Sequence, residues 1–217
     1  MDIVIAGGHG KVALRLERLL AGDGHHARAI VRNPDHAADI EAAGVEPVVL
    51  DLEAVGGVGQ LADVARGADA IVFAEGAGPG SGPERKRTVD YGAAVKLIAA
   101  AQTAGIERYV LISTLGADRP DAGGEAMLPY FEAKHDAEEA LRASGLAFTI
   151  VRPGSLTDDP GSGLVTIAEH LGTWGSIPRD DVAALLAAVL VGNAAVGRTI
   201  EVVSGDTPIA DALAALD

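Results

Sequence analysis

A glycine-rich segment near the start of the sequence constrains the fold more than any other feature. The apolar run Ile3–Ala6 predicts a buried strand, Gly7-Gly8-His9-Gly10 predicts a tight turn, and a helical pattern with spaced leucines follows from Lys11. A strand, a glycine turn and a helix in this order bring bare backbone N–H groups and a helix N-terminus up to a pyrophosphate. The segment therefore predicts a dinucleotide site, although such turns also occur without a nucleotide.

Each position of the turn has an expected role. Gly7 would make the tight turn, and Gly10, which lacks a side chain, would let the phosphates approach the backbone. Ala13 stands where the third glycine of the pattern G-x-x-G-x-x-G is expected, and alanine is small enough for close packing of the helix on the strand. We expect the cofactor to be contacted along the whole turn, by Gly7, Gly8, His9, Gly10, Lys11 and Val12.

Apolar runs that predict strands alternate with helical patterns along most of the chain. The expected strands cover residues 3–6, 27–31, 46–50, 69–74, 108–113, 147–151 and 199–203, with a shorter one at 164–168. The expected helices cover residues 11–22, 33–40, 58–65, 89–104, 131–143, 182–190 and 210–216, and Asp180 or Asp181 would cap the sixth. This alternation predicts an α/β fold, a doubly wound parallel sheet with helices on both faces. No linker divides the chain, so we expect one domain over residues 1–217.

Composition excludes several classes of partner. The formal net charge of −14 over 217 residues argues against binding to nucleic acid or to anionic membranes. The absence of cysteine excludes disulfides and thiol catalysis and favours a cytoplasmic location. We also expect no signal peptide, because the chain enters a strand at once, and no membrane span, because no apolar run approaches about 20 residues. The expected partner is a small molecule, and the sequence leaves a monomer or a homodimer open.

Arg32, at the end of the second expected strand, bears on which cofactor would bind. A site selective for NAD(H) usually has an Asp or Glu there, which holds the ribose hydroxyls. An arginine instead offers a planar fork of donors to the 2′-phosphate of NADP(H). We therefore expect NADP(H), with NAD(H) as the alternative. Without the glycine turn, Arg32 would equally be a solvated residue at a strand end.

Two later strand ends add residues to the expected cofactor site. Asp51 would accept a hydrogen bond from the adenine amino group while Leu52 packs on the ring, or Asp51 simply starts a turn. Ala74 and Gly76, in the loop after the fourth strand, would let the dinucleotide pass close to the backbone. Glu75 lies between them and would be unfavourable near phosphates, so we expect its side chain to point away.

Tyr130 and Lys134 are the candidate catalytic pair. Residues four apart lie on one face of a helix, and an ammonium group beside a phenol favours the phenolate. Such a tyrosine can give a proton to a carbonyl group that is being reduced. Ser113, at the end of the fifth strand, would hydrogen-bond the same carbonyl oxygen. Tyrosine and lysine also occur at this spacing by chance, and Pro129 could change the direction of the phenol.

Eight segments together resemble a known family. They are Ala6–Val12, Val31–Pro34, Asp51-Leu52, Val110–Thr114, Tyr130 with Lys134, Ser144–Leu146, Thr149–Leu156 and Ile177–Ala183. The chain resembles the atypical short-chain dehydrogenase/reductase superfamily, in particular its small NAD(P)H-binding, NmrA-like branch. The resemblance covers essentially the whole chain and is more specific for fold and cofactor class than for activity.

The resemblance implies a Rossmann domain in which residues 154–181 and 204–217 form a small C-terminal substrate region. Ser113, Tyr130 and Lys134 match the catalytic residues of the superfamily, and Ser113 and Lys134 would also contact the cofactor. Pro153 and Gly154 would border the nicotinamide. Members of this branch often have degenerate catalytic motifs, and some bind the cofactor as redox sensors.

These features favour one function and leave others open. We expect an NADP(H)-dependent oxidoreductase that transfers a hydride between nicotinamide and a small carbonyl or quinone-like substrate, with Tyr130 as general acid/base. A non-catalytic NADP(H)-binding sensor or regulatory protein is the alternative. A sugar-nucleotide epimerase or dehydratase is less expected, because the region after Gly154 is short for such a substrate. No histidine has metal-ligand spacing with a carboxylate, so we expect no metal, and Trp174 would either form a wall of a substrate pocket or pack structurally.

Overall fold

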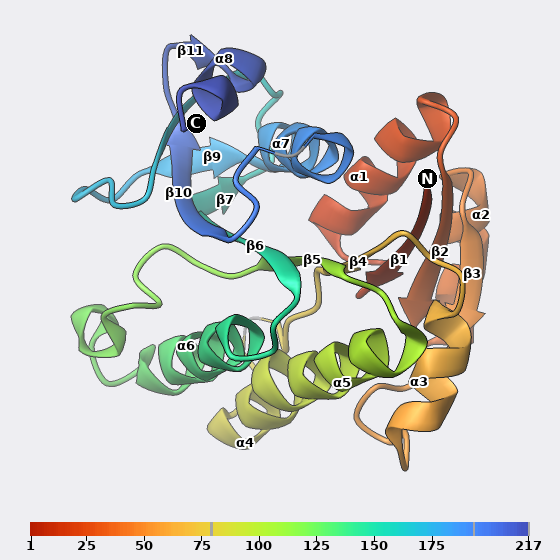
Figure 1. Ribbon diagram of the computed structural model, residues 1–217. Helices are drawn as coiled ribbons and strands as arrows, with labels where there is room; N and C mark the ends of the chain where they lie inside the picture. Colours follow the sequence, from red (N-terminus) through yellow and green to blue (C-terminus); the bar gives the residue numbers. More distant parts are fainter. Residues whose placement is uncertain (79, 193, 217) are drawn as a thin grey trace.

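Within residues 1–78, 80–192 and 194–216, which the computed structural model describes, nine strands form a central sheet (Figure 1). These strands are β1 (Asp2–Ala6), β2 (His26–Val31), β3 (Glu46–Val49), β4 (Ala70–Phe73), β5 (Arg108–Ile112), β6 (Ala147–Pro153), β8 (Leu164–Ala168), β10 (Arg198–Ser204) and β11 (Thr207–Pro208). A separate parallel pair consists of β7 (Ser155–Thr157) and β9 (Ser176–Pro178).

Helical segments connect most of the strands. The α-helices are α1 (Lys11–Gly22), α2 (Ala37–Ala42), α3 (Val58–Ala65), α4 (Pro83–Lys86), α5 (Ala94–Ala104), α6 (Leu128–Arg142), α7 (Arg179–Val191) and α8 (Ile209–Ala214). Two 3₁₀ turns, η1 (Pro34–His36) and η3 (Pro120–Gly123), precede α2 and α6, and a π-helical segment, η2 (Arg87–Ala93), joins α4 to α5.

The order of the strands confirms the predicted fold class. The strands of the sheet lie in the order β11-β8-β10-β6-β5-β4-β1-β2-β3. The seven strands from β10 to β3 in this order are parallel to one another. Only β8 runs antiparallel to its neighbours in the described sheet. The chain order reverses between β1 and β4, which is where a doubly wound sheet opens a crevice beyond the carboxyl ends of its strands.

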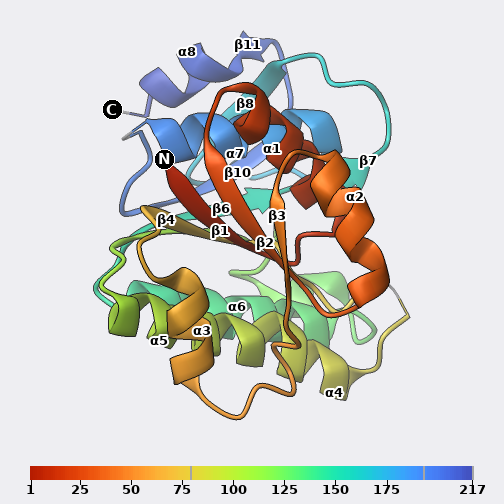
Figure 2. The same ribbon diagram turned by 90° about the vertical axis from the view of Figure 1, so that its right-hand side faces the viewer.

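Two apolar layers hold the helices on the sheet. Along β1, Ile3 and Ile5 face a cluster with α1 and α7, whereas Val4 faces a cluster with α3 and α5. Figures 1 and 2 show α1, α7 and α8 on one side of the sheet and α3, α5 and α6 on the other. Since both faces are covered, β4 and the Ile3–Ala6 part of β1 are apolar without alternation, as parallel strands usually are.

Several element boundaries differ from the prediction for tertiary reasons. β6 continues through Pro153, because proline keeps its carbonyl, which accepts a hydrogen bond from the Leu115 N–H at 2.9 Å. α6 begins at Leu128, three residues earlier than expected, so Tyr130 lies in its first turn. The helix before β5 also begins earlier, at Pro83, and passes through the π-helical segment η2.

The predicted cap of α7 is wrong. The residue before α7 is Pro178, and Asp180 and Asp181 lie inside its first turn. Their carboxylates accept hydrogen bonds from the backbone of a neighbouring loop instead, Asp181 from the Gly163 N–H at 2.7 Å and Asp180 from the Gly161 N–H at 3.3 Å. Among the described residues, no helix combines the length and the apolarity that a membrane crossing requires.

Glu17 is an acidic residue within the apolar layer under α1. It has no exposed surface, and no donor in the described part of the chain reaches either of its carboxylate oxygens. A Cβ added to Gly8 would lie 3.1 Å from Glu17 Oε1 and 3.3 Å from Ile40 Cδ1, so the carboxyl packs beneath the glycine turn. Burial raises the pKa of Glu17 to about 8.

Replacing Glu17 by glutamine is expected to make the free energy of unfolding less dependent on pH. The folded chain binds more protons than the unfolded chain between the ordinary pKa of 4.5 and the raised value of about 8. The contribution of Glu17 to the free energy of unfolding is therefore fully present below its ordinary pKa. Between that pKa and the raised one, the free energy of unfolding falls by about 1.4 kcal/mol per pH unit. From pH 5.5 to 7, the wild type should lose about 2 kcal/mol more than Glu17→Gln in urea unfolding. Equal slopes for the two proteins would contradict a neutral buried acid.

Candidate functional site

A cavity of about 370 Å³ opens beyond the carboxyl ends of β1, β2 and β4. It is lined by Gly7, His9, Gly10, Ile30, Val31, Arg32, Asn33, His36, Leu50, Ala74, Glu75, Gly76, Ala77 and Arg85. Six of these are predicted cofactor residues, namely Gly7, His9, Gly10, Arg32, Ala74 and Gly76. The cavity lies at the switch point of the sheet, where ligands of such folds are held.

Two glycines of the turn lie so close to backbone atoms that a side chain there would force a shift. Gly7 has φ +79°, and a Cβ added to it would lie 2.7 Å from the Cα of Glu75. Gly10 donates its N–H to the Gly7 carbonyl at 2.9 Å and precedes α1 in an extended conformation. A Cβ on Gly10 would lie 3.1 Å from that same carbonyl oxygen. This bare turn at the start of a helix fits a pyrophosphate group.

Glu75 is among the residues that line the cavity, and the direction expected for its side chain remains a prediction. Burial raises the pKa of Glu75 to about 7, the nearby Arg32 charge opposes that rise, and the carboxylates of Glu53 and Asp51 add to it. A buried acid in this position holds less negative charge at neutral pH than an exposed glutamate would.

Asp51 and Leu52 lie beside the cavity rather than on its wall. Asp51 Oδ1 accepts the Glu53 N–H at 2.9 Å, which is the turn-starting geometry named as the alternative. Leu52 is 3% exposed and packs in the apolar layer with Val4 and Ile30. Their contacts with adenine remain predictions.

Three predicted residues of the glycine turn also face elsewhere. Gly8 packs against β2, because a Cβ on it would lie 2.6 Å from the Ala29 Cβ, and Val12 is buried in the layer under α1. The Lys11 ammonium donates to Asp158 Oδ2 at 2.6 Å, outside the cavity. A contact of Gly8 with phosphate would come from its backbone, and the cofactor roles of all three residues remain predictions.

Lys134 lies at the ends of two strands that border the site. Its ammonium donates to the carbonyl oxygens of Glu75 at 3.3 Å and Ile112 at 3.2 Å, and it pairs with Asp90 Oδ1 at 3.2 Å. Burial alone would lower the pKa of Lys134, but the Asp90 carboxylate and the Tyr130 phenol outweigh it, so the pKa is raised. Lys134 is therefore a fixed positive charge at this edge of the sheet.

Tyr130 and Lys134 share one face of α6, as predicted from their spacing. The Lys134 ammonium lies 6.0 Å from the centre of the Tyr130 ring, and a second ammonium, of Lys86, lies 4.9 Å from it. Two ammonium groups are therefore close to the Tyr130 ring. Sequence reasoning missed Lys86 and Asp90, because both are distant from Tyr130 in the chain.

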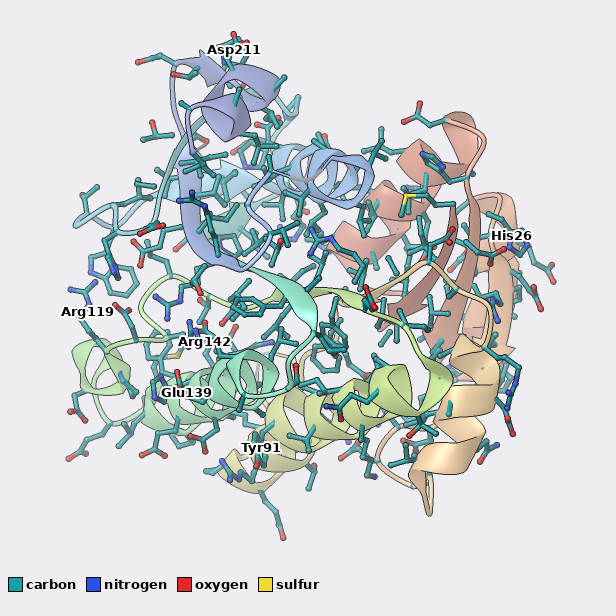
Figure 3. All side chains as sticks on the ribbon, viewed as in Figure 1. His26, Tyr91, Arg119, Glu139, Arg142 and Asp211 are labelled. Atoms are coloured by element: carbon teal, nitrogen blue, oxygen red, sulfur yellow. The ribbon has the colours of Figure 1, made fainter. Side chains whose placement is uncertain are left out.

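Ser113 is held in a buried network of charged side chains. Its hydroxyl donates to Glu138 Oε1 at 2.5 Å, and the same carboxylate receives two hydrogen bonds from Arg152, at 2.9 and 2.6 Å. Arg142 adds another at 2.9 Å, and Figure 3 labels this residue next to Glu139 on α6. Among the described residues, no hydrogen bond joins Ser113 to Tyr130 or Lys134, so its action on a carbonyl oxygen remains a prediction.

A histidine and two carboxylates form a second cluster of polar side chains. Asp118, His170 and Glu201 offer ligand atoms within 4.8 Å of one another, although they are far apart in the chain. The three residues come together only in the fold, so their spacing in the sequence could not indicate the cluster, and the expectation of no metal remains a prediction. Arg152 Nη1 lies 3.5 Å from an oxygen of Asp118 and 3.5 Å from an oxygen of Glu201, so a guanidinium already supplies positive charge there.

Pro153 and Gly154 lie where the sheet meets the C-terminal segments. The Gly154 N–H donates to the Val202 carbonyl at 2.9 Å, and a Cβ on Gly154 would lie 2.4 Å from the Gly175 carbonyl oxygen. Trp174, which is 55% exposed, covers Gly116 so closely that a Cβ there would lie 2.6 Å from the indole. Whether Pro153 and Gly154 border nicotinamide remains a prediction.

The parallel sheet, its switch point and the glycine turn after β1 define a Rossmann-type, dinucleotide-binding protein. Residues 7–192 match the family model described as NAD(P)H-binding. The chain belongs to this NAD(P)H-binding family, in agreement with the predicted resemblance to atypical short-chain dehydrogenases/reductases.

Similar proteins extend over the whole chain. The uncharacterized sugar epimerase YhfK of Bacillus subtilis is 41% identical over 214 residues, which cover 98% of this chain and 99% of YhfK. A Bacillus halodurans structure, described as a candidate NAD-dependent epimerase/dehydratase, is 36% identical with a TM-score of 0.93 over 100% of both chains. The oxidoreductase ylbE of Lactococcus lactis is 30% identical with a TM-score of 0.88, over 100% of this chain and 96% of that one.

Proposed function

We propose that this protein is an NADP(H)-dependent oxidoreductase that acts on a small carbonyl or quinone-like substrate. One observation supports the proposal above the others. Glu75 packs its backbone on Gly7, lines the cavity, and accepts a hydrogen bond from Lys134 through its carbonyl. Glu75 thus brings the glycine turn and the Tyr130/Lys134 pair close together, and hydride transfer coupled to proton transfer needs cofactor and proton donor near one substrate.

The cofactor would be held mainly by backbone and by arginine. Gly7 and Gly10 would bind the pyrophosphate, and Arg32 would bind the 2′-phosphate from the cavity wall. When bound, nicotinamide supplies or accepts the hydride. Ala74 and Gly76 present little side chain to a dinucleotide passing across the ends of β1 and β4.

The proton would be moved by Tyr130. Its hydroxyl gives a proton to the substrate oxygen during reduction and takes it back during oxidation. Lys134 stabilises the phenolate through its charge, and Asp90 and two backbone carbonyls hold the ammonium in place. Ser113 would orient the substrate oxygen only if its hydroxyl exchanged the bond to Glu138 for one to substrate.

Turnover with a substrate panel tests the proposal. We expect consumption of NADPH, followed by its absorbance, with at least one member of a panel of aldehydes, ketones and quinones. A protein that binds NADPH and NADP⁺ with different affinities but consumes neither would instead be a cofactor sensor. The bond from Ser113 to Glu138 is the observation that favours this alternative.

The name of YhfK suggests a second catalytic candidate, an epimerase. The same cofactor and tyrosine serve epimerisation when the hydride is returned to the substrate, so the two functions differ in stoichiometry. A reductase oxidises one NADPH for each product formed. An epimerase converts many substrate molecules with no net change in cofactor, and product analysis by mass and stereochemistry separates the two.

Replacing Arg32 by alanine is expected to weaken NADPH binding roughly 10- to 100-fold, because a charge-assisted hydrogen bond to phosphate is lost. Binding of NADH, which lacks the 2′-phosphate, should change by no more than about twofold. Fluorescence titration of both cofactors measures the ratio. An equal loss for NADPH and NADH would remove the preference for NADP(H).

A further inference from the structure

Three loops at the switch point bring two arginines to one carboxylate oxygen. Arg32 follows β2, Glu53 follows β3, and Arg85 lies in α4 after β4. Glu53 Oε2 lies 3.2 Å from Arg32 Nη1 and 2.8 Å from Arg85 Nη2. The other oxygen, Oε1, accepts a hydrogen bond from the Thr88 hydroxyl at 2.7 Å. Both guanidinium groups are therefore oriented toward a single anionic point.

The two arginines also border the cavity, whereas Glu53 is not part of its wall. Their side chains are 52% and 40% exposed, and that of Glu53 is 25% exposed. Two guanidinium groups share one carboxylate, so these three side chains together carry a net charge of +1. A phosphate dianion would match this excess better than a carboxylate, because it offers more oxygens to two planar donor forks.

We propose that Arg85 is the second arm of a 2′-phosphate clamp with Arg32, and that Glu53 is the stand-in anion that holds both arms until the phosphate arrives. This inference rests on the proposed function. It adds Arg85 as a residue that determines cofactor specificity and Glu53 as an anion that competes with the phosphate. Arg32 alone cannot surround a phosphate from one strand end. Arg85 lies in α4 after β4, on the other side of β1 from β2, so the two arginines reach the cavity edge from different strands.

Glu53 then has a defined effect on selectivity. In the absence of the phosphate, the Glu53 carboxylate offsets the repulsion between the Arg32 and Arg85 guanidinium groups. When the phosphate binds, Glu53 becomes a like-charged neighbour that opposes it. The carboxylate therefore lowers the affinity for NADP(H). It leaves the affinity for NAD(H) unchanged, because NAD(H) has no 2′-phosphate. Thr88 keeps Glu53 at the edge by binding its other oxygen.

The experiment compares Arg85→Gln and Glu53→Gln with the wild type, by titration with NADPH, NADH, 2′,5′-ADP and 5′-ADP. We expect Arg85→Gln to weaken NADPH and 2′,5′-ADP at least tenfold and to change NADH and 5′-ADP by less than about twofold. Glu53→Gln should tighten NADPH and 2′,5′-ADP several-fold and leave the other two ligands unchanged. Thermal unfolding checks that both variants are folded.

Arg87→Gln is the matched control. Arg87 lies two residues along the chain, stacks on Tyr91 at 3.9 Å and pairs with Asp136, and it does not line the cavity. The Arg87→Gln variant should bind NADPH, NADH, 2′,5′-ADP and 5′-ADP as tightly as the wild type. If the wild type prefers NADPH but Arg85→Gln keeps that preference, the clamp is wrong and the proposed function stands. If the wild type binds NADH as tightly as NADPH, the proposed cofactor and the clamp fail together. Weaker NADPH binding in Glu53→Gln would overturn the role of Glu53 as a competitor.

Discussion

Replacing Tyr130 by phenylalanine is expected to lower kcat for a carbonyl substrate by roughly 10²- to 10⁴-fold, the usual contribution of a positioned general acid. The change removes one oxygen and keeps the ring, which lies close to the ammonium groups of Lys86 and Lys134. Cofactor affinity should stay within about twofold, because the glycine turn and Arg32 are unaffected. Stopped-flow turnover under saturating NADPH, with a separate binding titration, measures both quantities.

Tyr91→Phe is the control for the loss of a phenol as such. Tyr91 lies on the π-helical segment η2 and carries the Arg87 guanidinium over its ring at 3.9 Å. It should retain wild-type turnover. If Tyr130→Phe also retained it, with the same dependence on pH, Tyr130 would not be the proton donor. The cofactor site would then stand without the assigned chemistry.

The fold is predictable from sequence because its signals are local. Apolar runs bounded by turns mark the parallel strands, and the spacing of leucines marks the helices that cover them. The boundaries are less predictable, since they depend on partners elsewhere. β6 extends through Pro153 because Leu115 and Val202 continue the pairing, and nothing near Pro153 in the sequence specifies this.

The convergence of residues around the cavity is also largely predictable, for a topological reason. The carboxyl ends of parallel strands meet at one edge, so residues after β1, β2 and β4 converge whatever their distance in the chain. The sequence does not indicate that Arg85 lies at the cavity, because Arg85 belongs to a charged run, Glu84–Arg87, of a kind typical of a solvated surface. Glu138 did carry a usable signal: it follows Lys134 by one helical turn and so shares its face. Its partner Arg152 gave none, because a buried arginine at a strand end is not expected from composition.

Replacing Glu138 by alanine is expected to lower the free energy of unfolding by about 3–5 kcal/mol, the range for removing one partner of a buried ion pair. Arg152 would lose both of its short hydrogen bonds, and its remaining carboxylates, Asp118 and Glu201, lie 3.5 Å from it. Ser113 would lose its acceptor as well. For a chain of this length the melting temperature should fall by roughly 6–20 °C, which calorimetry measures.

Glu139→Ala provides the matched control, because Glu139 is the next residue on α6 and is 57% exposed. Its ion pair with Arg142 at 2.5 Å faces solvent, so its loss should change stability by less than about 1 kcal/mol. A loss below about 1 kcal/mol for Glu138→Ala as well would mean that Asp118 and Glu201 satisfy Arg152 on their own. The network would then matter for the position of Ser113 rather than for stability. The two roles separate further in Glu138→Gln, which keeps an acceptor for the Ser113 hydroxyl but removes the charge that Arg152 requires.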